Sequence, residues 1–121
     1  MHKLYIMSIA VLVACNAFSQ SHSNNWVFGD STGLNFSTPI PTFFKTSILS
    51  YEACASISDS TGILLFYTNG QKVWDRNNEM MPNGDSLNIG KSSFDDPSSI
   101  TQGVTILPKP GSNTMYYIFQ L

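Results

Sequence analysis

Short apolar runs separated by Gly, Asn, Asp and Pro follow one another along residues 25–121. No run among them shows ten residues of apolar positions at a helical spacing. Short runs bounded by turn residues are typical of antiparallel strands, so the pattern predicts an all-β chain. The predicted strands cover residues 25–29, 33–37, 53–58, 63–68, 72–74, 101–107 and 115–121.

Three turns predict how these strands pair. Residues 59–62 (DSTG) separate two predicted strands and place Gly where a positive φ is needed, which favours a tight β-hairpin. Residues 69–70 (NG) form the strongest short hairpin signal and lead into the strand 72–74. Residues 108–111 (PKPG) predict the turn of a last hairpin.

Two long segments between the strands are predicted to be loops. Residues 38–50 contain Pro39 and Pro41, and proline bars a central strand because it lacks the N–H donor. Residues 75–99 are mostly polar, with a turn at 82–84 and room for no more than a short edge strand. Because loops commonly carry binding contacts, both segments are the expected contact sites.

Two features point beyond a simple all-β fold. Successive residues are apolar in 63–67 (ILLFY) and 115–119 (MYYIF), whereas a strand with one solvated face alternates, so both faces are expected to be covered. The hairpin over 55–66 also reappears over 104–118, at an interval of about 50 residues. Radially stacked sheets explain both features, which predicts about one and a half blades of an incomplete β-propeller. The alternative explanation of the repeat is that two β-hairpins resemble each other by composition alone.

The N-terminal residues read as an export signal. A basic start is followed by an apolar run at 4–15, and the small residues Ala17 and Ser19 occupy the positions that signal peptidase requires. A membrane span takes about 20 apolar residues, so this run is too short to be one. We therefore expect a secretory signal peptide over residues 1–19 and a mature chain that begins at Gln20.

A second processing route is open. Residues 12–15 (LVAC) resemble the lipobox of bacterial lipoproteins, in which the cysteine is lipidated, so Cys15 is the alternative lipidation site. By either route Cys54 is the one cysteine left in the domain over residues 20–121, and no disulfide is expected there.

Composition excludes several classes of protein. Only 12% of the residues are charged, about half the usual share, and six Lys and Arg stand against eight Asp and Glu without clustering. Such a chain lacks the basic surface that nucleic acid requires. Two cysteines cannot form a zinc ribbon. We expect no cofactor.

No residue is predicted to be catalytic or to bind metal. His22 lies next to the predicted new terminus, where nothing is expected to hold it rigidly, and Cys54 lacks a neighbouring base. The pair at 95–96 (DD) is better explained by turn chemistry than by glycoside hydrolysis. Residues 75–79 begin like a calcium loop, but Met80 stands where glycine is needed.

Both tryptophans are candidates for a carbohydrate site. Trp26 and Trp74 lie in short predicted strands, where large aromatic side chains are more often core residues. We therefore expect both indoles to be buried.

Several motifs, taken together, resemble one group of bacterial proteins. The chain resembles the N-terminal region of large secreted or surface proteins of Bacteroidetes-type bacteria, which continue through a propeller-like region into PKD-type or gliding-motility-associated modules and end in a type IX secretion sorting domain. The resemblance implies an N-terminal fragment located outside the cell, and it supplies no reaction and no active site. No later blade or sorting domain occurs in these 121 residues. Residues 25–36 (NWVFGDSTGLNF) resemble the group's opening NWYFG…GLDF, and residues 52–77 resemble its EGCASISD..GNLLFYTDG..VWNRN. The remaining motifs of the resemblance are residues 81–84 (MPNG), 106–111 (ILPKPG) and 116–119 (YYIF).

The same resemblance implies a modification. Asp-Ser-Thr at 30–32 and 59–61 and Asp-Ser-Leu at 85–87 are similar to the O-glycosylation sequon of these bacteria. The candidate sites are therefore Ser31, Ser60 and Ser86. Ordinary turn chemistry is the alternative explanation of these motifs.

The expected function is that of a non-catalytic extracellular structural or interaction module. Its partners would be an unidentified protein or glycan bound through the loops, the remainder of its own polypeptide, or the outer-membrane surface. One alternative is the N-terminal part of a secreted polysaccharide-acting enzyme whose catalytic residues lie beyond residue 121, and another is a small surface lipoprotein. Because the apolar strand 115–121 offers an unprotected edge, we expect the isolated chain to associate with itself.

Overall fold

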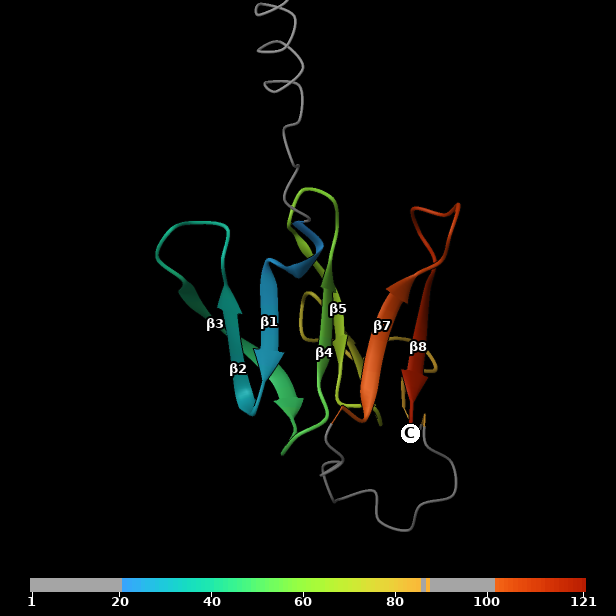
Figure 1. Ribbon diagram of the computed structural model, residues 1–121. Helices are drawn as coiled ribbons and strands as arrows, with labels where there is room; N and C mark the ends of the chain where they lie inside the picture. The colour runs from blue at the N-terminus through green and yellow to red at the C-terminus, as the bar shows by residue number, and fades with distance from the viewer. Residues whose placement is uncertain (1–20, 86, 88–101) are drawn as a thin grey trace, which may run out of the picture.

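The computed structural model describes residues 21–85, 87 and 102–121, and in these residues the chain is all-β, as predicted (Figure 1). A short 3-10 turn, η1 (Ser21–Ser23), precedes the strands. The strands are β1 (Asn25–Phe28), β2 (Asp30–Asn35), β3 (Thr42–Leu49), β4 (Ala55–Ser58), β5 (Leu64–Thr68), β6 (Val73–Asp75), β7 (Val104–Pro108) and β8 (Tyr116–Gln120).

The strands form three small antiparallel sheets. Sheet A has the order β1-β2-β3, sheet B the order β4-β5-β6, and sheet C pairs β7 with β8. The hairpins predicted around residues 59–62 and 69–70 are confirmed, because β4 pairs with β5 and β5 with β6. Gly62 has a φ of 89°, the positive value that this turn was expected to need. Among the described residues the sheets stay separate, and no closed sheet forms.

The prediction that residues 38–50 form a loop is wrong, because most of this segment is strand β3. Pro39 and Pro41 precede the strand, so neither removes a hydrogen bond from it. Strand β3 pairs only with β2 and so lies at the edge of sheet A. The ring of Phe44 lies over Gly33 of β2, where a Cβ would leave it no room.

The sheets pack face to face around a small core. Val27 and Ile48 of sheet A meet Tyr67 and Trp74 of sheet B, and the two aromatic rings stack with centroids 5.5 Å apart. The initial strands of the three sheets, β1, β4 and β7, are neighbours in that order (Figure 1). Each sheet thus contributes its first strand to a common row.

A buried amide joins sheet A to sheet B. Asn25 Nδ2 donates hydrogen bonds to Ser58 Oγ at 2.9 Å and to the Gly62 carbonyl at 2.8 Å. Asn35 Nδ2 donates in turn to Asn25 Oδ1 at 2.7 Å. Because Asn25 is almost fully buried, these partners replace the water that its polar atoms have lost.

The expectation that the apolar strands are covered on both faces is wrong for β8. Tyr116 and Ile118 turn inward, but Tyr117 and Phe119 are 46% and 54% exposed. The strand therefore alternates like one with a single covered face. In β5 only the end at Tyr67 is fully buried.

Candidate interaction surfaces

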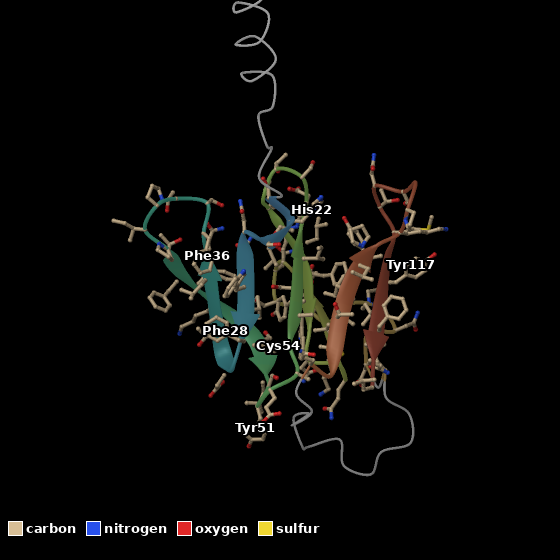
Figure 2. The ribbon with its side chains drawn as sticks, in the orientation of Figure 1. His22, Phe28, Phe36, Tyr51, Cys54 and Tyr117 are labelled. Carbon is tan, nitrogen blue, oxygen red and sulfur yellow. The ribbon has the colours of Figure 1, made fainter. Side chains whose placement is uncertain are left out.

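The outer side of sheet A is an exposed apolar surface, called here the aromatic face (Figure 2). Trp26 and Phe43 are 55% and 80% exposed. The prediction that Trp26 is buried is wrong, because β1 alternates and turns Asn25 and Val27 inward instead; Trp74 is buried as predicted. The pairing of Trp26 with Leu34 and of Leu34 with Phe43 places all three on one side of the sheet. The aromatic face consists of Trp26, Phe28, Leu34, Phe36 and Phe43.

Part of this face is held in place by its surroundings. The rings of Trp26 and Phe36 are tilted against each other with centroids 5.0 Å apart. Trp26 Nε1 donates a hydrogen bond to the Ser23 carbonyl at 3.0 Å, and the Phe36 amide donates to the Asn24 carbonyl at 2.7 Å. The two rings are thus fixed in an orientation that leaves their outer sides free for contact.

Sheet C presents a second apolar surface at the other end of the stack. Tyr117 and Phe119 of β8 lie beside Leu107 of β7, and all three are exposed. The centroids of the two aromatic rings are 6.0 Å apart. The stack of sheets therefore ends in an apolar face on both sides.

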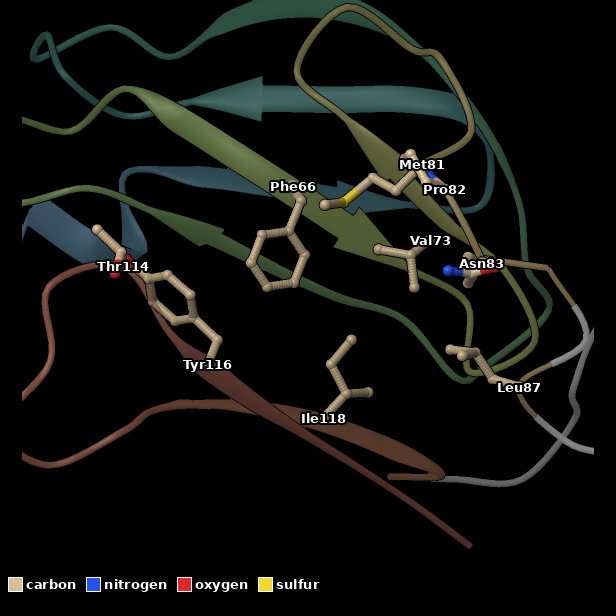
Figure 3. A pocket seen from close by; sticks show the side chains of 10 residues that line it. Phe66, Val73, Met81, Pro82, Asn83, Leu87, Thr114, Tyr116 and Ile118 are labelled. Atoms are coloured by element: carbon tan, nitrogen blue, oxygen red, sulfur yellow. The ribbon is translucent and has the colours of Figure 1, made fainter.

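A pocket of about 290 Å³ lies between sheets B and C (Figure 3). Phe66 and Val73 line it from sheet B, Tyr116 and Ile118 from sheet C, and Met81 from the segment after β6. The rings of Phe66 and Tyr116 meet edge to face, with their centroids 5.4 Å apart. None of the described residues that line it carries a charged side chain.

The structure places two of the predicted modification sites in exposed positions. Ser31 has a φ of 55° at a bulge in β2, and its Oγ donates to Asp30 Oδ1 at 2.8 Å. Ser60 lies in the exposed turn between β4 and β5. Ser86, the lipidation candidate Cys15 and the predicted signal peptide over 1–19 lie outside the described residues.

Carboxylates organise two of the turns. Asp59 Oδ1 accepts hydrogen bonds from the Thr61 hydroxyl and amide and from the Ile63 amide, and the bonds from Thr61 and Ile63 hold the pKa of Asp59 below its usual value. Asp75 Oδ1 accepts from the Glu79 amide, which likewise lowers the pKa of Asp75. Asp59 therefore stabilises its own turn, which is the alternative explanation of the glycosylation motif at residues 59–61.

His22 is better ordered than the sequence suggested. Its Nδ1 donates to the Ser58 carbonyl at 2.6 Å, which ties η1 to β4, so the prediction that nothing holds this ring is wrong. Cys54 is a free, half-buried thiol beside the core, and burial raises its pKa. Within residues 21–85, 87 and 102–121, no three His, Cys, Asp or Glu side chains cluster as metal ligands would.

Sequence reasoning missed Phe43, the most exposed member of the aromatic face, because it assigned the segment to a loop. The alternation of burial along β3 has its counterpart in the sequence, where Phe44, Thr46 and Ile48 recur at every second position. That period of two is the signal that could have identified the strand.

Comparisons with known proteins identify no relative. No protein-family model matches the chain, and neither a curated protein nor a solved structure matches it. In the part of the chain that the structure describes, no helix has the length and apolar character needed to cross a membrane. The surfaces described above are thus the basis for a functional proposal.

Proposed function

We propose that this protein is a non-catalytic, exported structural or interaction module, and that its three sheets belong to a propeller-like platform. The outer faces of sheets A and C then receive neighbouring sheets, which the remainder of a longer polypeptide supplies. The observation that carries this proposal is the aromatic face. Large exposed apolar patches mark interaction sites, because burying them releases ordered water.

The way in which the sheets already stack favours another sheet as the occupant of this face. Sheet A packs on sheet B through Val27 and Ile48, and sheet B packs on sheet C through Phe66. Apolar and aromatic side chains thus mediate both junctions between the described sheets. The aromatic face repeats that composition on the open side of sheet A.

The aromatic face can be tested with a hydrophobic dye. The native protein should bind the dye, and replacing both Trp26 and Phe43 by Gln should lower the signal, while the exposed face of sheet C still contributes to it. The melting temperature should change little, because both replaced side chains are exposed. Ile63→Gln is the matched control, since Ile63 is also half exposed but lies in the turn before β5. Equal dye binding by the double variant and the native protein would contradict the proposal.

The gene sequence after codon 121 discriminates between the functions weighed above. Further hairpins at an interval of about 50 residues would support the platform. A hydrolase domain would favour the polysaccharide-acting enzyme instead, and a stop codon would contradict the platform.

We further propose that the protein is exported and processed before Gln20. His22 in η1 lies after this cut, so processing leaves its bond to Ser58 in place. Intact-mass measurement of exported protein should give an N-terminus at Gln20. A diacylglyceryl group on Cys15 would contradict this and support the surface lipoprotein.

We also propose glycosylation at Ser31, Ser60 or Ser86. Ser31 and Ser60 are exposed, which is what a modifying enzyme needs. Intact mass of the protein from its native host should exceed that of the unmodified chain, and replacing the three serines by Ala should remove the excess. An excess mass that survives these substitutions, or none at all, would contradict the proposal.

A further inference from the structure

The outer edge of sheet B is covered by its own chain. The Val73 amide donates to the Gly84 carbonyl at 2.7 Å, and the Met81 amide donates to the Val73 carbonyl at 3.0 Å. The Asp75 amide donates to the Glu79 carbonyl at 2.9 Å. The segment after β6 thus occupies the main-chain groups that another strand would need.

The outer edge of sheet A is covered by side chains. The Ser47 amide donates to the Tyr67 hydroxyl at 2.8 Å, and Asn78 Nδ2 donates to the Lys45 carbonyl at 3.3 Å. Lys45 also places a charge on this edge strand, which opposes pairing with a further strand.

Strand β8 has none of these protections. In the β7–β8 ladder, pairs that exchange main-chain hydrogen bonds alternate with pairs that do not. The Lys109 amide donates to the Met115 carbonyl and the Leu121 amide to the Gly103 carbonyl, so the odd-numbered residues of β8 form the hydrogen-bonded pairs with β7. The main-chain groups of Tyr116, Ile118 and Gln120 therefore point away from β7. No bond from these groups to another part of the described chain is found. The strand contains no charge, proline or bulge and lies at the margin of the fold (Figure 1).

The internal repeat shows what fits on this edge. The hairpin of β7 and β8 corresponds to that of β4 and β5, and β5 carries a third strand, β6, on its outer edge. Sheet C has no third strand among the described residues. The edge of β8 thus corresponds to one that accepts a strand in sheet B.

We propose that a second copy of this chain fills the edge, with β8 pairing antiparallel to β8 about Ile118. Each Ile118 then faces its counterpart, and Tyr116 faces Gln120 of the second copy; these are the hydrogen-bonded pairs, because their main-chain groups point outward. Tyr117 faces Phe119 of the second copy in the closer, non-hydrogen-bonded pairs. Aromatic pairs stabilise such positions, so the strand is complementary to itself. This inference concerns an edge, and it does not rest on the proposed stacking of sheet faces. A strand that follows Leu121 in a longer polypeptide, in the place that β6 takes after β5, is the competing occupant of this edge, and a monomeric native protein would favour it.

Charged substitutions on β8 test this arrangement in solution. Light scattering after size exclusion should show a concentration-dependent dimer of the exported protein. Tyr117→Lys with Phe119→Lys places like charges opposite each other across the dimer and should raise the dissociation constant at least about tenfold. Leu107→Lys is the matched control, because Leu107 lies on the same exposed face but on β7. A native protein that stays monomeric, or an equal loss of dimer in the control, would overturn the proposal.

A strand added to the same chain separates the edge from the face. Residues 69–75 (NGQKVWD) copied after Leu121 should fold back on β8 as β6 does on β5, and the protein should become monomeric. The matched control carries the same extension with Pro at the positions of Lys72 and Trp74, which prevents pairing, and it should remain a dimer. A dimer that persists with the unaltered extension would show that the edge is not its interface.

A cysteine cross-link tests the register. In a Cys54→Ser background, Ile118→Cys should form a disulfide-linked dimer on oxidation, since directly paired positions lie about 5.5 Å apart. Tyr117→Cys should not, because its partner is Phe119 of the second copy. Efficient cross-linking at position 117 with none at 118 would refute the symmetric pairing.

Discussion

Removing the hydroxyl of Tyr67 should destabilise the fold, because this phenol joins sheet A to sheet B. The side chain is 0% exposed, and its ring stacks on Trp74. The hydroxyl accepts a hydrogen bond from the Ser47 amide and donates one to Asn78 Oδ1, each 2.8 Å long. Tyr67→Phe keeps the ring and its packing and removes only these two bonds.

The expected cost follows from the surroundings of the two partners. A typical hydrogen bond contributes about 0.5–1.5 kcal/mol net, and a buried partner left unsatisfied costs more. Ser47 is exposed and can bind water after the change. We therefore expect Tyr67→Phe to lower the free energy of unfolding by about 1–2 kcal/mol. Tyr67→Ala also leaves a cavity and should cost about 3–5 kcal/mol.

Urea unfolding followed by tryptophan fluorescence measures this cost. The midpoint should fall while the slope m stays unchanged, because the surface exposed on unfolding is nearly the same. Asn78→Gly serves as the second variant of a double-mutant cycle, since Asn78 has a φ of 67° that glycine tolerates. The cycle should show a coupling of at least about 0.5 kcal/mol. An unchanged midpoint for Tyr67→Phe would refute this account of the phenol.

Three further changes should also destabilise the fold, each measured by thermal unfolding. Gly62→Val should cost about 1–3 kcal/mol, because a β-branched residue is strained at a φ of 89°, whereas Ser60→Val in the same turn should have little effect. Asn25→Ala should cost about 1–3 kcal/mol, because it leaves the buried Ser58 of sheet B and the half-buried Asn35 of sheet A without their partner. Acid should destabilise the protein through Asp59 and Asp75, because the pKa values of both carboxyls are lowered in the folded state. Their contribution to the free energy of unfolding is present above about pH 4 and is lost as the pH falls through the lowered pKa values. Replacing both carboxylates by Asn should flatten this decline.

The strands and hairpins of sheet B could be predicted because their determinants are local. Asp59 binds amides within four residues of itself, and the turn at 69–70 has the residues that a tight hairpin requires. Such signals are written within a single short window of the sequence. The pairing of β4, β5 and β6 follows directly from them.

The errors arose where a global pattern had to be inferred from a local one. Two prolines suggested a loop over 38–50, although a proline just before a strand does not interrupt it. Trp26 was assigned to the core because of its size, although alternation along β1 decides which side chains turn inward. The exposed face of β8 could not be predicted, because coverage depends on which neighbouring sheet is present.

Side chains that bind main-chain groups far along the sequence explain much of what remained hidden. Asn69 is a clear case, because it has two separate roles. Its Oδ1 accepts from the Gln71 amide at 3.0 Å and the Lys72 amide at 2.9 Å, which shapes the hairpin turn. Its Nδ2 donates to the Leu49 carbonyl at 3.0 Å, which ties that turn to the end of β3. Only the first role could be predicted from the sequence.

Substitutions at Asn69 should separate these two roles. Asn69→Ala removes both and should cost about 1–3 kcal/mol, because Asn69 is nearly buried. Asn69→Asp keeps the acceptor for the turn but sets a carboxylate against the Leu49 carbonyl, which raises the pKa of the new group in the folded state. Its stability relative to the native protein should therefore improve as the pH falls, since a protonated carboxyl can donate to that carbonyl. Thermal unfolding between pH 7 and about pH 4 measures this difference. A difference in melting temperature that does not change with pH would mean that the bond to Leu49 contributes nothing, and that Asn69 serves only its own turn.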